Sequence, residues 1–281
     1  MSHTESTPTP AQGDSHALNS DPNVAASENA PRIREVGFLA PFRWLKLGLR
    51  DMRARAGESI FFGFCFAAMG MAITLVFEHA YQYTSAMSSG FLLMGPFLAI
   101  GLYEISRQQA YNTPRPFSET LTIWRHNAGN IGVFSLVLTV IFLLWARASL
   151  IVFALFFTDE MPNLTGFLQQ VTSTENLEFI AGYCSVGLLF AALVFAVSIV
   201  SIPFMLDKNR DAITAMFYSI AALARNPAPC ALWAVLIVIL TLLGFASFHV
   251  GLIFVMPLIG HATWHAYADL IGHTPVGPRP E

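Results

Sequence analysis

The sequence predicts an all-α membrane protein with six transmembrane helices. Composition, segment length and charge placement are the observations behind this prediction. Hydrophobic residues make up 54% of the 281 residues and charged residues only 12%, whereas about a quarter of a soluble domain is charged. Several apolar segments are long enough to cross ~30 Å of hydrocarbon as helices. The predicted spans are 59–80, 89–106, 130–157, 178–206, 230–246 and 248–270.

Basic residues lie almost entirely on one side of these spans. That side holds Arg32, Arg34, Arg43, Lys46, Arg50, Arg53, Arg55, Arg107, Arg115, Arg125, Lys208, Arg210, Arg225 and Arg279. The opposite side holds Glu78, Asp159, Glu160, Glu175 and Glu178, with no Lys or Arg in its loops. Because cytoplasmic loops are enriched in Lys and Arg, we expect both the N and C termini of this multi-pass protein to be cytoplasmic.

Outside the spans, the composition divides the chain into one membrane domain and two tails. Residues 1–31 are rich in Ser, Thr, Pro and Ala and hold few large apolar side chains. Such a segment buries too little apolar surface to offset its ordering entropy, so we expect a disordered N-terminal tail. The transmembrane domain is predicted over 32–273, and a short C-terminal tail over 274–281.

Three amphipathic segments on the cytoplasmic side are predicted to lie in the membrane interface. In 41–55, an apolar stripe runs beside a basic stripe at helical spacing, which is typical of a helix lying in an anionic headgroup layer. Its stripes consist of Phe42, Leu45, Leu49 and Met52, and of Arg43, Lys46, Arg50 and Arg53. Segments 117–127 and 211–226 show the same amphipathic pattern.

The order of these segments suggests a threefold internal repeat. Each unit consists of a surface helix, an outward span and a return span that contains a proline. The prolines are Pro96, within the stretch 93–104 (LMGPFLAIGLYE), Pro203 and Pro257. Internal repeats are common in transport folds, but they also occur in proteins with no known transport activity.

Several motifs also carry a resemblance to a known family. The basic helix at the start, GPFLAIGLYE at 95–104, WRHN at 124–127 and the sixth span resemble an uncharacterised family of bacterial integral membrane proteins. Some members of that family are labelled cytochrome c oxidase subunit I-like. The resemblance spans 32–273 and implies a six-helix protein of a bacterial inner membrane, with no established activity. The chain is about half the length that a twelve-helix haem–copper subunit requires.

If the three units pack around a common axis, polar residues near the cytoplasmic ends of the return spans would converge. These candidates are Glu104, Asp207, Asp211, His261 and His265. Paired carboxylates and imidazoles shift each other's pKa values, so such a cluster suits proton or cation handling. Alternatively, each residue caps a helix or forms a salt bridge with Arg107, Lys208 or Arg210.

Two further features concern charge or ligation inside the spans. His261, His265 and Asp269 share one helix face at i, i+4 and i+8, which is compatible with haem or metal ligation or with plain packing. Two histidines make an incomplete zinc site, so we predict no metal site. Arg147 lies within the third span, where it either snorkels to the outer interface or pairs with Glu78 or with Asp159 and Glu160.

No catalytic motif is found, and no catalytic residue is predicted. The first functional hypothesis is a non-enzymatic accessory or assembly component of a membrane complex, with respiratory complexes as candidate partners besides the lipid bilayer. The alternative is a small transporter or channel for protons, ions or a lipidic solute. A third option is haem or quinone binding at the sixth span. The absence of a basic excess argues against nucleic acid as a partner.

Overall fold

A computed structural model of the chain describes residues 31–79, 83–156 and 177–272. The chain divides into two units, Met1–Arg32 and Ile33–Glu281, and the helices considered below all belong to the second. Nearly all of the predicted N-terminal tail lies outside the described residues. So do the C-terminal tail and residues 159–176, which lie between the predicted third and fourth spans.

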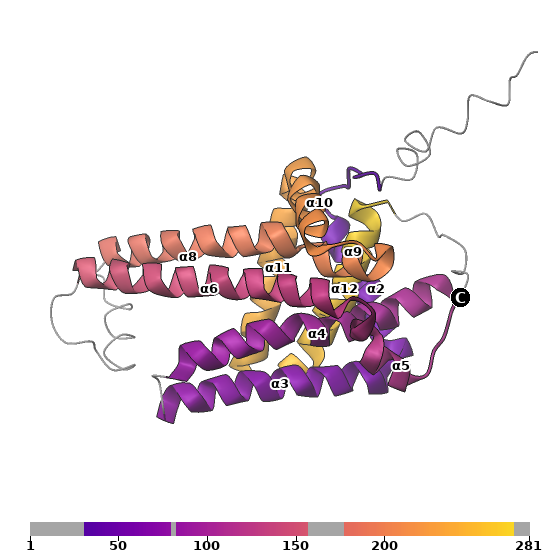
Figure 1. The fold of residues 1–281 in the computed structure, drawn as a ribbon, viewed down its shortest axis with the longest axis horizontal. Coiled ribbons are helices and arrows are strands. Elements are labelled where there is room, and N and C mark those ends of the chain that lie inside the picture. Colours follow the sequence, from indigo (N-terminus) through magenta and orange to yellow (C-terminus); the bar gives the residue numbers. More distant parts are fainter. Residues whose placement is uncertain (1–30, 80–82, 157–176, 273–281) are drawn as a thin grey trace, which may run out of the picture. The chain divides into compact units, whose positions relative to one another are not determined.

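The described residues form helices joined by turns, and none of them is in a strand. The order in the chain is shown in Figure 1. The helices are α2 (Ala40–Ala54), α3 (Ala56–His79), α4 (Thr84–Tyr111), α5 (Phe117–Thr122), the 3₁₀ helix η3 (Ile123–Asn127), α6 (Ala128–Phe156), α8 (Leu177–Ser198), α9 (Ser201–Lys208), α10 (Ala212–Arg225), α11 (Pro227–Ala246) and α12 (Leu252–Leu270).

Four helical segments among the described residues are long and apolar enough to cross a membrane. They are Ala56–His79, Phe117–Phe156, Leu177–Lys208 and Pro227–Ala246. The predicted second and sixth spans correspond to α4 and α12, each of which carries a proline in its interior. The prediction of an all-helical membrane fold is therefore confirmed, with four candidate spans.

Consecutive long helices pack against each other. α3 contacts α4, α6 contacts α8, and α11 contacts α12, as Figure 1 also shows for the first two pairs. α12 additionally contacts α2, α3, α4 and α9, so it lies at the centre of the packing. Its side chains Trp264 and Tyr267 are 0% and 1% exposed and belong to the main hydrophobic core, together with Trp44 of α2.

Two glycines allow α12 to approach its neighbours closely. A Cβ added to Gly63 of α3 would lie 2.0 Å from the carbonyl oxygen of Ile253. A Cβ on Gly48 of α2 would lie 2.7 Å from the backbone nitrogen of Ala262. Small residues at such positions let helix backbones come together, which is a common way for helices to pack in membranes.

The three prolines act differently on their helices. Pro96 and Pro257 lie inside continuous helices, α4 and α12. Before Pro203, however, the chain leaves the helical conformation at Ile199 and Val200, so the predicted fourth span is two helices, α8 and α9. Because proline lacks a backbone N–H and clashes with the preceding turn, a break just upstream is physically expected.

The amphipathic segments do form helices, but their protein-facing sides differ from their apolar stripes. α2 buries Trp44, Gly48 and Asp51 against the rest of the protein, while Phe42 of its apolar stripe is 52% exposed. α10 buries only small side chains and exposes large apolar ones. Its buried residues are Ala212, Ala215, Ser219 and Ala222, and its exposed apolar residues are Ile213, Phe217 and Ile220.

Candidate functional site

A buried carboxylate, Asp207 of α9, joins the ends of three helices. The hydroxyl of Tyr111, at the end of α4, donates a hydrogen bond of 2.9 Å to its Oδ1. The hydroxyl of Tyr267, in the last turns of α12, donates one of 2.7 Å to its Oδ2. The Lys208 ammonium lies 3.1 Å from Oδ2, and the Asp207 side chain is only 3% exposed. The negative charge is thus balanced by a cation and by hydroxyl donors from two other helices.

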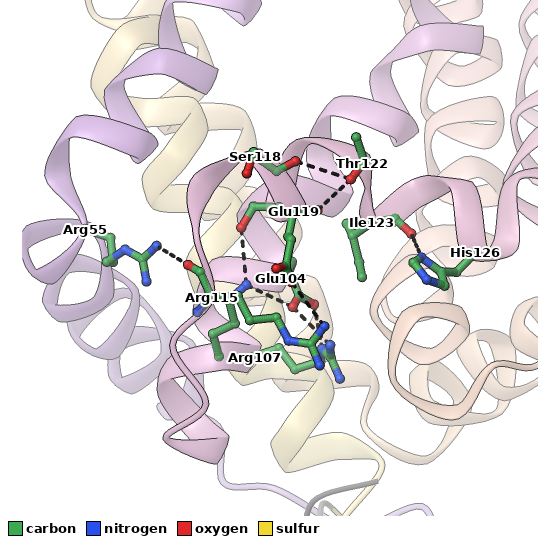
Figure 2. Close-up of polar contacts among 11 residues, drawn as sticks. Arg55, Glu104, Arg107, Arg115, Ser118, Glu119, Thr122, Ile123 and His126 are labelled. Atoms are coloured by element: carbon green, nitrogen blue, oxygen red, sulfur yellow. Dashed lines mark hydrogen bonds and ion pairs between the residues drawn. The ribbon is translucent and has the colours of Figure 1, made fainter. Parts of the chain in front are cut away.

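Glu104, fully buried in α4, is held by donors from its own helix. Its Oε2 accepts from Nε of Arg107 at 2.6 Å, and its Oε1 accepts from Nη2 of Arg107 and from Nε2 of Gln108, each at 3.0 Å. Arginine presents parallel donors to both carboxylate oxygens, which is a strong arrangement for a buried ion pair. Figure 2 shows Glu104 and Arg107 together beneath α5.

Gln108 extends this pairing to the segment that follows α4. Its Nε2 donates to the hydroxyl of Thr120 in α5 at 3.2 Å, and its Oε1 accepts from the backbone N–H of Arg115 at 3.1 Å. Arg115 in turn accepts at its carbonyl from Arg55 and pairs with Glu119 across 3.4 Å, as Figure 2 shows. Gln108 therefore links Glu104 to α5 and to the turn between α4 and α5.

His261 lies between two serine hydroxyls and is 0% exposed. Its Nε2 is 2.9 Å from Oγ of Ser59 in α3, and its Nδ1 is 2.8 Å from Oγ of Ser106 in α4. The Ser59 hydroxyl also donates to the carbonyl of Arg55 at 2.9 Å. This pattern favours a neutral imidazole whose Nε2–H donates to Ser59 and whose Nδ1 accepts from Ser106. Both ring nitrogens are then engaged by neighbouring helices.

The next two polar residues on the same face of α12 bind α2. Nε2 of His265 lies 2.8 Å from Oδ2 of Asp51, whose side chain is 2% exposed. Asp269 accepts from the indole N–H of Trp44 and from the guanidinium of Arg43. The predicted i, i+4, i+8 face is thus used to attach α2, α3 and α4. The described residues contain no cluster of three or more His, Cys, Asp or Glu side chains placed to hold a metal ion.

Asp211 and Arg147 lie apart from these contacts. Asp211 is exposed and caps α10, its Oδ1 accepting from the backbone N–H of Thr214 at 2.8 Å. That hydrogen bond stabilises the charged carboxylate and lowers the pKa of Asp211. Arg147 of α6 is exposed and forms no salt bridge with a described residue. Two of its proposed partners, Asp159 and Glu160, fall outside the described part of the chain.

Each of the five polar residues that were predicted to converge is therefore bonded to a residue outside that group of five. The alternative of salt bridges is confirmed for Glu104 with Arg107 and for Asp207 with Lys208. The sequence did not predict the other partners, which are the hydroxyls of Tyr111, Ser59 and Ser106 and the carboxylate of Asp51. One signal was available for Asp51, since it is the acidic residue in an otherwise basic helix and shares a helical stripe with Trp44 and Gly48. Chemically, these contacts neutralise buried charge and hold helices together.

Comparison with known proteins adds one match. Residues 84–207, from the start of α4 to α9, match the model of a family described as predicted integral membrane protein, DUF2189. The match covers less than half of the chain and includes Glu104, Tyr111 and Asp207. No curated protein and no solved structure matches the chain. The apolar helices and this match identify an integral membrane protein that is similar to the DUF2189 family over that segment.

Proposed function

We propose that this protein is a non-enzymatic accessory or assembly component of a larger membrane complex. The observation that carries the proposal is the direction in which side chains point. Glu104, His261 and Asp51 are buried and bonded to other side chains of the same chain. Large apolar residues such as Phe217 (68% exposed) and Leu188 (72%) point outward. Apolar outward surface suits contact with lipid and with other membrane helices.

The proposal includes the finer topology that the sequence indicates. In it, α3, α4, α6, α8 with α9, α11 and α12 form six spans, and both termini lie in the cytoplasm of a bacterial cell, at its inner membrane. The charge asymmetry between the two sides supports this orientation. The repeated order of short helix, long helix and proline-bearing helix supports the threefold repeat. α2, α5 with η3, and α10 are then the interfacial helices.

Recovery of native partners tests the proposal. The full-length protein, tagged at one end, is extracted from its native membrane in a mild detergent, and proteins that copurify are identified by mass spectrometry. We expect particular membrane proteins in a fixed ratio to the bait, with respiratory subunits the first to look for. An absorption spectrum of the same sample tests haem and quinone binding. A colourless protein recovered without partners would count against the accessory role.

A variant pair locates the contact surface in the same experiment. Phe217 lies on the exposed apolar stripe of α10, and Leu243 is a comparably exposed apolar residue of α11, 60% against 68%. If α10 contacts the partner, Phe217→Ala reduces partner recovery while Leu243→Ala leaves it unchanged. If both variants recover the same amount of partner protein, the contact surface does not include Phe217 of α10.

Transport of protons or ions is the second candidate, and the Asp207 contacts favour it. Asp207 of α9 accepts hydrogen bonds from α4 and α12, and each of these three helices contains a proline. Ionisable residues in membrane proteins often mark ion or proton pathways. Reconstituted Asp207→Asn, Glu104→Gln and His265→Ala proteins should then lose flux. Equal flux in wild-type and variant vesicles, or none in any, would remove this candidate.

A further inference from the structure

An apolar groove of about 990 Å³ separates the α6–α8 pair from α11. This volume lies at the upper end of the ~300–1,000 Å³ that ligand sites occupy. Its walls include Trp145 of α6, Gly187 and Ala191 of α8, and Ile239 of α11. α10, which contacts both α8 and α11, adds Leu223 at one end. The groove is therefore bounded by three candidate spans and one surface helix.

The walls offer an occupant almost nothing but hydrocarbon. None of the described lining side chains is charged. The Ser198 hydroxyl, at the α10 end, is occupied by a 2.6 Å hydrogen bond to the carbonyl of Val194. The indole N–H of Trp145 is a further polar group in the described lining. A polar solute would therefore lose most of its hydration here for few hydrogen bonds, which costs several kcal/mol per group. The occupant must be a hydrocarbon chain or an apolar helix.

The length of the groove decides between these two. Along α8 the lining runs from Gly187 to Ser198, and at 1.5 Å per residue this distance is about 17 Å. The hydrocarbon core of a bilayer is about 30 Å thick, so the groove spans roughly one leaflet. A transmembrane helix of a partner would need a groove about twice as long. An acyl chain, which ends near the middle of the bilayer, fits this depth.

We propose that the groove is a binding site for the acyl chains of a phospholipid from the leaflet on the side of α10. The headgroup lies at the level of α10, and the chains extend past Ala191 toward Gly187. Small side chains at these two positions make room for the chains, while Trp145 forms part of the opposite wall. This inference requires the protein to be in a membrane, but it does not depend on a partner complex.

Filling the groove tests the inference. Ala191→Trp places an indole inside it, whereas Leu189→Trp places the same side chain two residues away on α8, at a position that is 67% exposed and outside the lining. Full-length wild type and both variants are purified with extensive detergent washing, and retained lipids are identified by native mass spectrometry. We expect wild type and Leu189→Trp to retain phospholipid and Ala191→Trp to lose it.

Three results would overturn the assignment. Equal phospholipid retention by all proteins, or by none, would mean that the groove holds no specific lipid. A retained quinone in place of phospholipid would assign the groove to an isoprenoid tail. A loss of self-association in Ala191→Trp alone, measured by the mass of the protein–detergent complex, would assign the groove to a helix of a second copy.

Discussion

Replacing Asp207 with alanine should destabilise the protein more than any other single polar substitution at the ends of α4, α9 and α12. The change removes the carboxylate that accepts hydrogen bonds from Tyr111 and Tyr267 and that pairs with the Lys208 ammonium. Removing one member of a buried ion pair costs about 3–5 kcal/mol, and the 24% exposure of the remaining Lys208 places this variant toward the lower end of that range. For a protein of this size each kcal/mol lowers Tm by about 2–4 °C, so we expect a decrease of roughly 6–20 °C.

The assay is thermal unfolding of the purified protein in detergent, followed by intrinsic fluorescence. Tyr267→Phe removes one hydrogen bond to a charged acceptor, so its free-energy cost should be smaller, about 1.5–3 kcal/mol. The triple variant Asp207→Leu, Tyr111→Phe, Tyr267→Phe removes the carboxylate together with both hydroxyls. It keeps Lys208, whose side chain is 24% exposed and can hold its ammonium in water. Because replacing a buried polar set with apolar side chains of similar volume is often nearly neutral, its Tm should recover toward that of wild type.

Two outcomes would refute this reasoning. If Asp207→Ala unfolds at the temperature of wild type, the carboxylate does not hold the three helices together. If the triple variant is no more stable than Asp207→Ala, the loss does not come from the hydrogen bonds that Tyr111 and Tyr267 donate to Asp207. Either result would remove the Asp207 contacts as an explanation for how these helix ends are joined.

Three more perturbations follow from single contacts. Gly63→Ala should lower Tm, because its Cβ would lie 2.0 Å from the Ile253 carbonyl oxygen and such overpacking costs about 1–3 kcal/mol. The control is Gly57→Ala in the same helix, where nothing lies within 4 Å of the added Cβ. His265→Ala should loosen α2 by leaving Asp51 unpaired, so trypsin should cleave after Arg50 faster than in wild type or in the exposed-histidine control His126→Ala. Asp211→Ala should speed amide hydrogen exchange at Thr214, whereas Asp211→Asn should preserve the cap. Folding lowers the pKa of Asp211. The contribution of this cap to stability is therefore complete above the pKa that Asp211 has in the unfolded chain, and it is lost as the pH falls through the lower pKa of the folded protein.

Hydropathy predicted where helices form but not which side of each helix faces the protein. In α2, the stripe containing Phe42 and the buried stripe of Trp44, Gly48 and Asp51 are both periodic at 3.6 residues. In α10, the buried side is Ala212, Ala215, Ser219 and Ala222, which a search for large apolar residues overlooks. In a membrane protein lipid is as apolar as the core, so hydrophobicity alone does not distinguish outside from inside.

The threefold repeat also gave no indication of several bonding partners of the polar residues. It suggested a cluster of carboxylates and imidazoles, whereas Asp207 binds the hydroxyls of Tyr111 and Tyr267. What the sequence did predict, as an alternative, was that these ionisable residues form salt bridges, as Glu104 does with Arg107 and Asp207 with Lys208. The tyrosine and serine hydroxyls that bind them carry no charge pattern by which to find them.

The Asp207 contacts are better explained by specificity of packing than by net stability. Burying a carboxylate costs several kcal/mol in desolvation, and its bonds to Tyr111, Tyr267 and Lys208 do little more than offset that cost. A purely apolar set would hold the helices as tightly, but it would tolerate rotation or sliding of α4 and α12. A carboxylate with two oxygens, each bound to a hydroxyl from a different helix, permits one register only. The stable triple variant expected above should therefore differ from wild type in the uniformity of its helix packing.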